Sequence, residues 1–201
     1  MKLIGMLDSP YVRRVSVSAK CLGIDLEHES VSVFRHFERF QQINPVVKAP
    51  TLILDDGVVL MDSTLILDYL EASSGKSLLP SDLKQRAKAL RLIGLSLAAC
   101  EKAVQLYYER NLRPADIQYQ PWVERVEGQL AAAFTALEKE LEHSDLPVDG
   151  SLAQTGISLA VAWSFTELVV PDQIDAARFA RIAEYTAYAE GTDAFISTPM
   201  N

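Results

Sequence analysis

The sequence predicts an α/β N-terminal domain with a mixed four-stranded sheet, followed by an all-helical C-terminal domain. Strand-like apolar runs alternate with helical patterns in the first 73 residues, whereas apolar side chains recur only at helical spacing beyond residue 83. The intervening segment SSGKSLLPSD, at 73–82, is rich in small and polar residues, which is typical of a linker. We therefore expect domains at residues 1–73 and 83–201, joined by a linker at 74–82.

The composition is that of an ordinary globular protein with an acidic surface. The 201 residues are 49% apolar and 23% charged, and the formal net charge is −8. This charge argues against nucleic-acid and anionic-membrane partners, because both need basic patches. No apolar run approaches the roughly 20 residues that span a bilayer. The strand-like start MKLIGM, soon followed by Asp8, makes a poor signal peptide. We expect a cytoplasmic protein.

The first helix has clear end signals. Ser9 is placed as its N-cap, Pro10 stands at the first helical position, where its missing N–H costs nothing, and Gly23 is placed to end it. Strands are predicted on either side of this helix, at residues 2–6 and 27–31. Residues 33–43 are predicted to form a short, irregular helix or a loop.

Residues 44–63, NPVVKAPTLILDDGVVLMDS, predict a loop, a β-hairpin and the start of a helix. Gly57 can take the positive φ that the hairpin turn needs, and Asp62 or Ser63 stands at the helix N-cap. The free N–H groups and positive dipole end of such a helix form a ready anion site. The order β-α-β-α-β-β-α, with a crossover first and a hairpin last, predicts a thioredoxin-like arrangement.

Four helices are predicted in the C-terminal domain, at residues 83 to about 110, 121–142, 152–170 and 176–190. Ser151 and Gln154 form a capping-box pattern ahead of the third helix, which is apolar enough to be central and buried. The expected apolar face of the first helix is Leu83, Ala87, Leu90, Gly94 and Leu97. That of the second is Val123, Val126, Leu130, Phe134, Leu137 and Leu141.

Three motifs resemble a known family. SPYVRRV at 9–15, NPVVKAPTL at 44–52 and DS at 62–63 resemble, in this order, the glutathione-binding half of cytosolic glutathione S-transferases, in particular bacterial-like members of the serine type. The two-domain plan is also similar, so the resemblance covers nearly the whole chain. It implies glutathione as co-substrate, a small hydrophobic electrophile as second substrate, and a homodimer in a detoxification role.

The resemblance implies roles for five residues. Ser9 would hydrogen-bond the glutathione sulfur and favour its thiolate. Pro50 would be a cis-proline that presents the backbone of Ala49 to the cysteinyl part, and Asp62 and Ser63 would hold the γ-glutamyl end. By spacing alone, Ser9 is also explained as a plain N-cap, Pro50 as a trans proline at a strand entry, and the Asp-Ser pair as a plain cap.

The glycyl carboxylate of glutathione needs a cation. His36 falls near the position where serine-type relatives often carry lysine, and Arg35, Arg39 and Lys48 are alternatives. Each of the four is equally well explained as part of a solvated polar surface.

The electrophile is expected between the domains. Candidate side chains for this pocket, chosen by bulk and position, are Tyr11, Tyr107, Tyr108, Arg110 and Trp163. Each is also explained as a core or surface residue. No metal site is expected, because three histidines and two cysteines lack ligand spacing.

Two functions stay open at this point. The first is a glutathione transferase that activates the thiolate of glutathione for attack on an electrophile. The second is a non-catalytic, glutathione-binding or regulatory protein of the same fold, because fold does not fix function. An isomerase or ligand-storage role is a more remote third.

Overall fold

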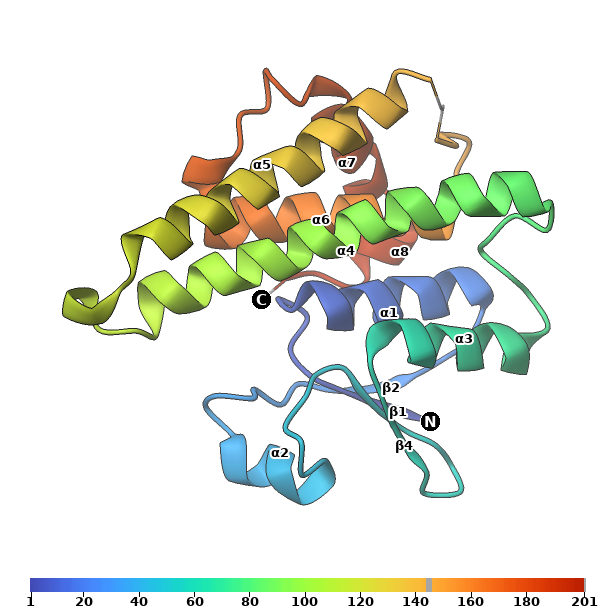
Figure 1. Cartoon of the computed structure of the whole chain (residues 1–201). Helices are drawn as coiled ribbons and strands as arrows, with labels where there is room; N and C mark the ends of the chain where they lie inside the picture. The colour runs from blue at the N-terminus through green and yellow to red at the C-terminus, as the bar shows by residue number, and fades with distance from the viewer. Residues whose placement is uncertain (144–145, 201) are drawn as a thin grey trace. The chain divides into compact units, whose positions relative to one another are not determined.

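The computed structural model describes residues 1–143 and 146–200. The chain forms two compact units. Unit 1 is Met1–Leu78 together with the tail from Gly191 onward, and unit 2 is Leu79–Glu190 (Figure 1). Among the helices that the structure describes, none is both long and apolar enough to cross a membrane.

Unit 1 contains the predicted mixed four-stranded sheet, in the order β2-β1-β3-β4. Strand β1 (Lys2–Ile4) pairs parallel with β2 (Glu27–Glu29) and antiparallel with β3 (Thr51–Ile53), and β3 pairs antiparallel with β4 (Val59–Met61). The register places Leu3 of β1 between His28 and Leu52. The predicted fold class is confirmed.

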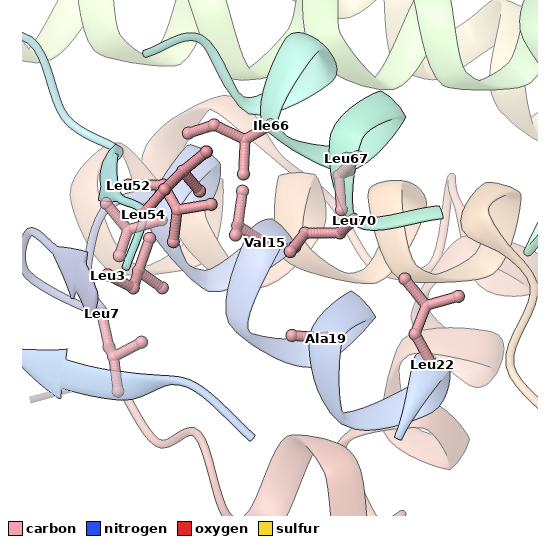
Figure 2. Close-up of a cluster of buried hydrophobic side chains, with 11 residues drawn as sticks. Leu3, Leu7, Val15, Ala19, Leu22, Leu52, Leu54, Ile66, Leu67 and Leu70 are labelled. Atoms are coloured by element: carbon pink, nitrogen blue, oxygen red, sulfur yellow. The ribbon is translucent and has the colours of Figure 1, made fainter. Parts of the chain in front are cut away.

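Helices cover both faces of this sheet (Figure 1). Helices α1 (Pro10–Leu22) and α3 (Ser63–Ser74) pack on one face, and α2 (Phe37–Ile43) covers the other. Because successive strand residues point to opposite faces, Leu3 and Ile4 enter different clusters. The larger cluster, drawn in Figure 2, consists of Leu3, Leu7, Val12, Val15, Ala19, Leu22, Leu52, Leu54, Ile66, Leu67 and Leu70.

Helix α1 has the predicted limits. Ser9 is at the N-cap with extended backbone, and Pro10 is the first helical residue. Gly23 ends the helix in the left-handed conformation, with φ 75°, and the Ile24 N–H donates to the Ala19 carbonyl. Both ends of this helix therefore lie where the local sequence signals predicted them.

Strand β1 is shorter than predicted because Gly5 leaves the strand conformation. Its φ is 141°, and a Cβ built on it would lie 2.6 Å from Cγ2 of Val12 and 3.2 Å from Cβ of Ala49. Only glycine permits this φ and this close approach. The chain therefore turns at Gly5 toward the loop that carries Ser9.

Unit 2 is helical. Its helices are α4 (Leu83–Asn111), α5 (Gln120–Leu141), α6 (Gln154–Val169) and α7 (Ala180–Glu190), with short 3₁₀ turns η1 (Ala115–Ile117) and η2 (Pro171–Gln173). Helix α6 packs against both α4 and α7, and every residue from Gln154 to Thr166 is buried. The predicted central buried helix is confirmed, as is the apolar face of α5.

The predicted apolar stripe of α4 is present, but most of it is exposed. Leu83 and Leu90 are 81% and 51% exposed, whereas the buried face is displaced around the helix. Periodicity finds an apolar stripe but does not say which stripe the chain itself covers. The buried side is Ala89, Leu92, Ile93, Ser96, Ala99, Cys100, Ala103, Leu106 and Glu109.

The predicted capping box does not form. Helix α6 begins at Gln154 with Ala153 at its N-cap, so Ser151 lies outside the helix and its hydroxyl donates to Oδ1 of Asp149 at 2.6 Å. The same carboxylate oxygen also accepts from the Ser151 backbone N–H at 3.0 Å, which is the N–H that the Gln154 side chain would accept from in a capping box. The last predicted helix is also shorter, because residues 176–179 form turns ahead of α7.

The tail forms a helix that the sequence did not predict, α8 (Asp193–Ile196), and it packs on α1. The buried guanidinium of Arg13 lies over the ring of Phe195, 4.9 Å from its centroid, and its Nε donates to the Thr198 carbonyl at 2.9 Å. The tail is therefore part of the packing of unit 1.

The contact between α6 and α7 gives a stability prediction. A Cβ on Gly156 would lie 1.9 Å from the Tyr185 hydroxyl oxygen, so Gly156→Ala overpacks the core of unit 2. We expect a loss of about 1–3 kcal/mol in the free energy of unfolding, measured by urea denaturation. Gly128→Ala is the matched control, because nothing lies within 4 Å of its built Cβ on exposed α5 surface. Equal effects of the two substitutions would contradict the packing account.

Candidate functional site

The loop before β3 is held by a buried asparagine. Asn44, 4% exposed, donates from Nδ2 to Oγ1 of Thr51 at 2.9 Å and accepts at Oδ1 from the Val46 N–H at 3.0 Å. The Thr51 hydroxyl in turn donates to the Lys48 carbonyl at 2.8 Å. These bonds fix the path of residues 44–51, because Asn44 and Thr51 bond to each other and also supply partners to the Val46 N–H and the Lys48 carbonyl.

The loop ends in a cis peptide bond between Ala49 and Pro50, as the resemblance implied. The Ala49 side chain packs against both core clusters of unit 1. Its backbone N–H and C=O have no hydrogen-bond partner among residues 1–143 and 146–200. Because Ala49 is half-buried, this N–H and C=O can be paired by water or by an extended ligand.

Helix α3 begins at the end of the hairpin. Asp62 is its N-cap, and Oδ1 accepts from the Thr64 N–H at 2.9 Å while Oδ2 lies 3.8 Å from Nζ of Lys48. Ser63, 4% exposed, is the first helical residue, and its Oγ accepts from Nη1 of Arg14 at 3.0 Å. Asp62 therefore does cap the helix, and it also presents a carboxylate beside a cation.

Two residues between 44 and 63 have strained backbones. Among the residues that the structure describes, the non-glycine residues with positive φ are Val47, at 52°, and Asp62, at 73°. Such conformations are rare, above all for a β-branched side chain, and they concentrate at functional sites. Both lie within residues 44–63, which favours a binding role for that stretch.

Ser9 stands at the N-cap of α1, half-buried, but its hydroxyl makes no capping bond to the helix. In the part of the chain that the structure describes, this hydroxyl takes part in no hydrogen bond. The plain-cap explanation of Ser9 therefore lacks the bond that defines it. An oxygen with a donatable proton stands instead at the positive end of a 13-residue helix.

Sequence reasoning missed Asp8 as a site residue. Burial raises the pKa of the Asp8 carboxyl above its ordinary value, and the Ser9 N–H and the charge of Arg35 oppose this shift. A carboxylate directly before Ser9 was the available signal. A negative charge on Asp8 would disfavour any anion that Ser9 would hold.

The four candidate cations have different surroundings. His36 is exposed, and its Nδ1 accepts from the Ser32 N–H at 3.2 Å, so the neutral ring carries its proton on Nε2. Arg39 pairs with Glu29, and Lys48 pairs with Asp62. Arg35 lies 4.0 Å from the Met6 sulfur.

The electrophile candidates of unit 2 separate into different environments. The rings of Tyr107 and Tyr108 lie 6.2 Å apart between centroids, and Tyr108 is 41% exposed. Tyr108 lines an open cavity of about 470 Å³, formed by Gln105, Tyr108, Glu109, Leu112, Arg113, Pro114, Ile117 and Trp122. Tyr11, in unit 1, is half-buried on the first turn of α1.

Trp163 is a core residue, which corrects the expectation that it lines a pocket. It is 1% exposed and packs edge-on against Phe134 and Phe179, with ring centroids 5.4 and 6.1 Å away. A tryptophan on a helix buried on all sides has no ring surface left for a ligand. Its bulk drew attention to it in the sequence, but bulk is also what fills a core.

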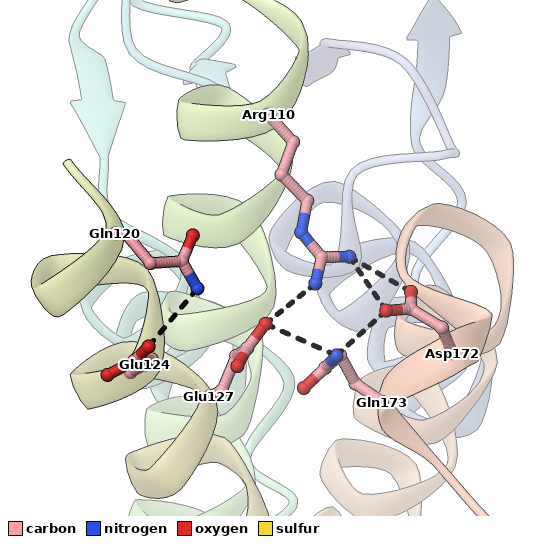
Figure 3. Close-up of polar contacts among 6 residues, drawn as sticks. All are labelled: Arg110, Gln120, Glu124, Glu127, Asp172 and Gln173. Atoms are coloured by element: carbon pink, nitrogen blue, oxygen red, sulfur yellow. Dashed lines mark hydrogen bonds and ion pairs between the residues drawn. The ribbon is translucent and has the colours of Figure 1, made fainter. Parts of the chain in front are cut away.

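Arg110 belongs to a structural ion-pair network (Figure 3). It donates to both carboxylate oxygens of Asp172, at 2.9 and 3.0 Å, and to Oε1 of Glu127 at 2.7 Å. Gln173 bridges the same two carboxylates. Hydrogen bonds to Asp172 raise the pKa of Arg110, and the Arg110 guanidinium lowers the pKa of Asp172. Arg110 joins the end of α4 to α5 and η2.

Among the described residues, no group of three or more His, Cys, Asp or Glu side chains lies close enough together to hold a metal ion.

The sheet order, the covering helices and the following helical unit define a thioredoxin-like domain joined to an all-helical one. Residues 3–77 match the glutathione S-transferase N-terminal domain as a sequence family. The chain is 27% identical over 173 residues to the uncharacterized GST-like protein YibF of Escherichia coli K12, and the match covers 85% of each.

Solved structures agree with this match. A glutathione S-transferase from Methylobacillus flagellatus with glutathione bound superposes with a TM-score of 0.89 and 25% identity, over 100% of this chain and 99% of that one. A glutathione transferase family member from Pseudomonas fluorescens Pf-5, with bound S-(propanoic acid)-glutathione, gives 0.83 and 25%, over 100% and 97%. Residues 3–77 of the chain thus match the glutathione S-transferase N-terminal domain, and its fold is that of solved glutathione S-transferases.

The Arg110 network predicts a pH-dependent stability. The pKa of Asp172 is lowered in the folded state, so its contribution is present above the ordinary pKa and is lost as pH falls through the folded value. We expect Arg110→Met to cost about 1 kcal/mol at neutral pH, a small value because solvent screens the half-exposed Asp172. The cost should shrink toward acid pH.

The measurement is urea denaturation of parent and variant across a pH series. Arg125→Met, which removes an exposed arginine of α5, is the control and should show no such trend. A cost that stays constant down to the lowest pH would contradict the ion-pair account.

Proposed function

We propose that this protein is a glutathione transferase of the serine type, which binds glutathione on unit 1 and activates its thiolate for attack on a small hydrophobic electrophile. The observation that carries the proposal is the unpaired N–H and C=O of Ala49 beside cis-Pro50. An extended peptide pairs with such groups as a strand pairs with a sheet edge. Relatives that bind glutathione and the family match support glutathione as that peptide.

The γ-glutamyl end would lie at the start of α3. Asp62 offers a carboxylate to the α-ammonium, in competition with Lys48 at 3.8 Å. Ser63 and the free N–H groups of the first helical turn would donate to the α-carboxylate. The glycyl carboxylate would accept from Nε2–H of His36, with Arg35, Arg39 and Lys48 as the alternatives; of these, Arg39 pairs with Glu29 and Lys48 with Asp62.

Ser9 supplies the chemistry in this proposal. The thiol loses its proton to solvent, and the Ser9 hydroxyl, which keeps its own proton, donates to the resulting thiolate. The sulfur lone pair then forms the bond to the electrophilic carbon, and the displaced electron pair leaves with the leaving group or takes up a proton. The unbonded hydroxyl at the positive end of α1 supports this role.

Tyr11, Tyr107 and Tyr108 remain our proposed electrophile contacts. Tyrosine rings combine apolar area with a polar tip, which suits a small aromatic electrophile. Arg110 and Trp163 are left out, because the first is held by two carboxylates and the second is buried.

A homodimer is part of the proposal. The exposed stripe of α4, Leu83, Ala87, Leu90 and Gly94, is an apolar surface that nothing in the described chain covers. In unit 1, Val59 and Met61 of the edge strand β4 are exposed apolar residues. Leu65 and Tyr69 of α3, the next helix in the chain, are exposed as well. Apolar surfaces of this kind mark protein interfaces, and the family resemblance favours a second copy as the partner.

The test of the chemistry is Ser9→Ala. Loss of one hydrogen bond to an anion costs about 1.5–3 kcal/mol, so we expect the pKa of bound glutathione to rise by about one to two. Turnover at neutral pH should fall at least tenfold, while glutathione affinity changes little, because Ala49, Asp62 and Ser63 are untouched. The measurements are thiolate ultraviolet absorbance against pH and a conjugation assay with an aromatic halide.

Ser16→Ala, on the same helix and also half-buried, is the matched control. A parent that binds glutathione but neither forms thiolate nor turns over would favour the non-catalytic alternative. Equal thiol titration in parent and Ser9→Ala would overturn the role of Ser9.

A further inference from the structure

Helix α1 carries two adjacent buried arginines with different partners. Arg13 and Arg14 are each 2% exposed, although arginine is almost never fully buried unless it is paired. Arg13 is held by the tail, through its bond to the Thr198 carbonyl. Arg14 instead reaches α3, where Nη1 donates to Oγ of Ser63 at 3.0 Å and to Oγ1 of Thr64 at 3.1 Å.

These bonds determine the direction of two hydroxyl protons. A guanidinium has only donors, so the oxygens of Ser63 and Thr64 must accept from Arg14. Their own hydrogens therefore point elsewhere, and neither has an acceptor among residues 1–143 and 146–200. A hydroxyl that accepts from a cation is also polarised, which makes it a better donor.

Three positive influences therefore meet at the first turn of α3. The helix dipole points its positive end there, the Ser63 N–H has no partner within the described chain, and the Arg14 guanidinium lies behind the two hydroxyls. Ser63 is 4% exposed, so water screens its contact with Arg14 weakly, whereas Thr64 is exposed. A carboxylate at this turn would accept from the hydroxyls that Arg14 orients.

We propose that Arg14 is a positioning residue for the α-carboxylate of an amino-acid ligand, acting through the hydroxyls of Ser63 and Thr64. The inference rests on the proposed function, in which that carboxylate belongs to the γ-glutamyl group of glutathione. Arg14 sets the hydroxyls as donors and adds charge behind them. It does not touch the sulfur, so it affects binding and leaves the thiol chemistry unchanged.

The experiment compares two ligands on four proteins. The ligands are glutathione and 4-aminobutanoyl-cysteinylglycine, which lacks only the α-carboxylate and keeps the ammonium. The proteins are the parent, Arg14→Met, Arg14→Lys and Arg13→Met, and calorimetry gives the affinity ratio of the two ligands for each. Arg13→Met is the matched control, because it removes an equally buried, adjacent guanidinium that contacts the tail.

We expect the parent to prefer glutathione over the analogue, and Arg14→Met to reduce that preference about tenfold or more, by weakening glutathione alone. Arg14→Lys should restore part of the preference through its charge. Arg13→Met should keep the parental ratio. In turnover, Arg14→Met should raise KM for glutathione and leave kcat and the thiol pKa unchanged.

Three results would overturn the inference. An unchanged ligand ratio in both Arg14 variants would show that Arg14 does not act on the carboxylate, and equal weakening of both ligands would show a merely structural role. A parent that binds glutathione no better than the analogue would exclude a carboxylate site at α3 while leaving glutathione binding intact. A parent that binds neither ligand would instead overturn the proposed function itself.

Discussion

The close approach at Gly5 is the constraint on which unit 1 depends. At this residue the end of β1 meets α1 through Val12 and the cis-proline loop through Ala49, with no room for a side chain. The same residue is tied to the end of β2, because its N–H donates to Glu29 and its carbonyl accepts from Nε2 of His28 at 2.8 Å. Ser9 and Ala49 are thereby carried by segments that converge on one glycine.

Electrostatics explains how an acidic chain would hold an anionic tripeptide. The formal net charge is −8, so attraction must come from local sources and not from the whole surface. Unit 1 supplies the N-terminal ends of α1 and α3, the buried guanidinium of Arg14, and Lys48. Asp8 works in the opposite direction, because its carboxyl group directly precedes Ser9 in the chain; burial raises the pKa of that carboxyl.

The helix ends and the sheet order could be predicted from the sequence, because they depend on residues close together in the chain. Ser9, Pro10 and Gly23 marked both ends of α1, Asp62 marked the start of α3, and the element order fixed the sheet. What depended on tertiary partners was not predictable. The hydroxyl of Ser151 donates to Asp149, Arg110 pairs with two carboxylates, and Trp163 is buried in the core. Arg14 was missed because its 49-residue separation from Ser63 leaves no pattern in the sequence.

The central claim is that glutathione pairs with the backbone of Ala49. The most direct measurement is the amide resonance of Ala49 in a ¹⁵N-labelled protein during titration with glutathione, together with its rate of hydrogen exchange. The account predicts that this resonance shifts on saturation and that the N–H becomes protected, while the amide of Gly128, in unit 2, serves as an unaffected reference. An Ala49 N–H that neither shifts nor gains protection when glutathione is bound would contradict it.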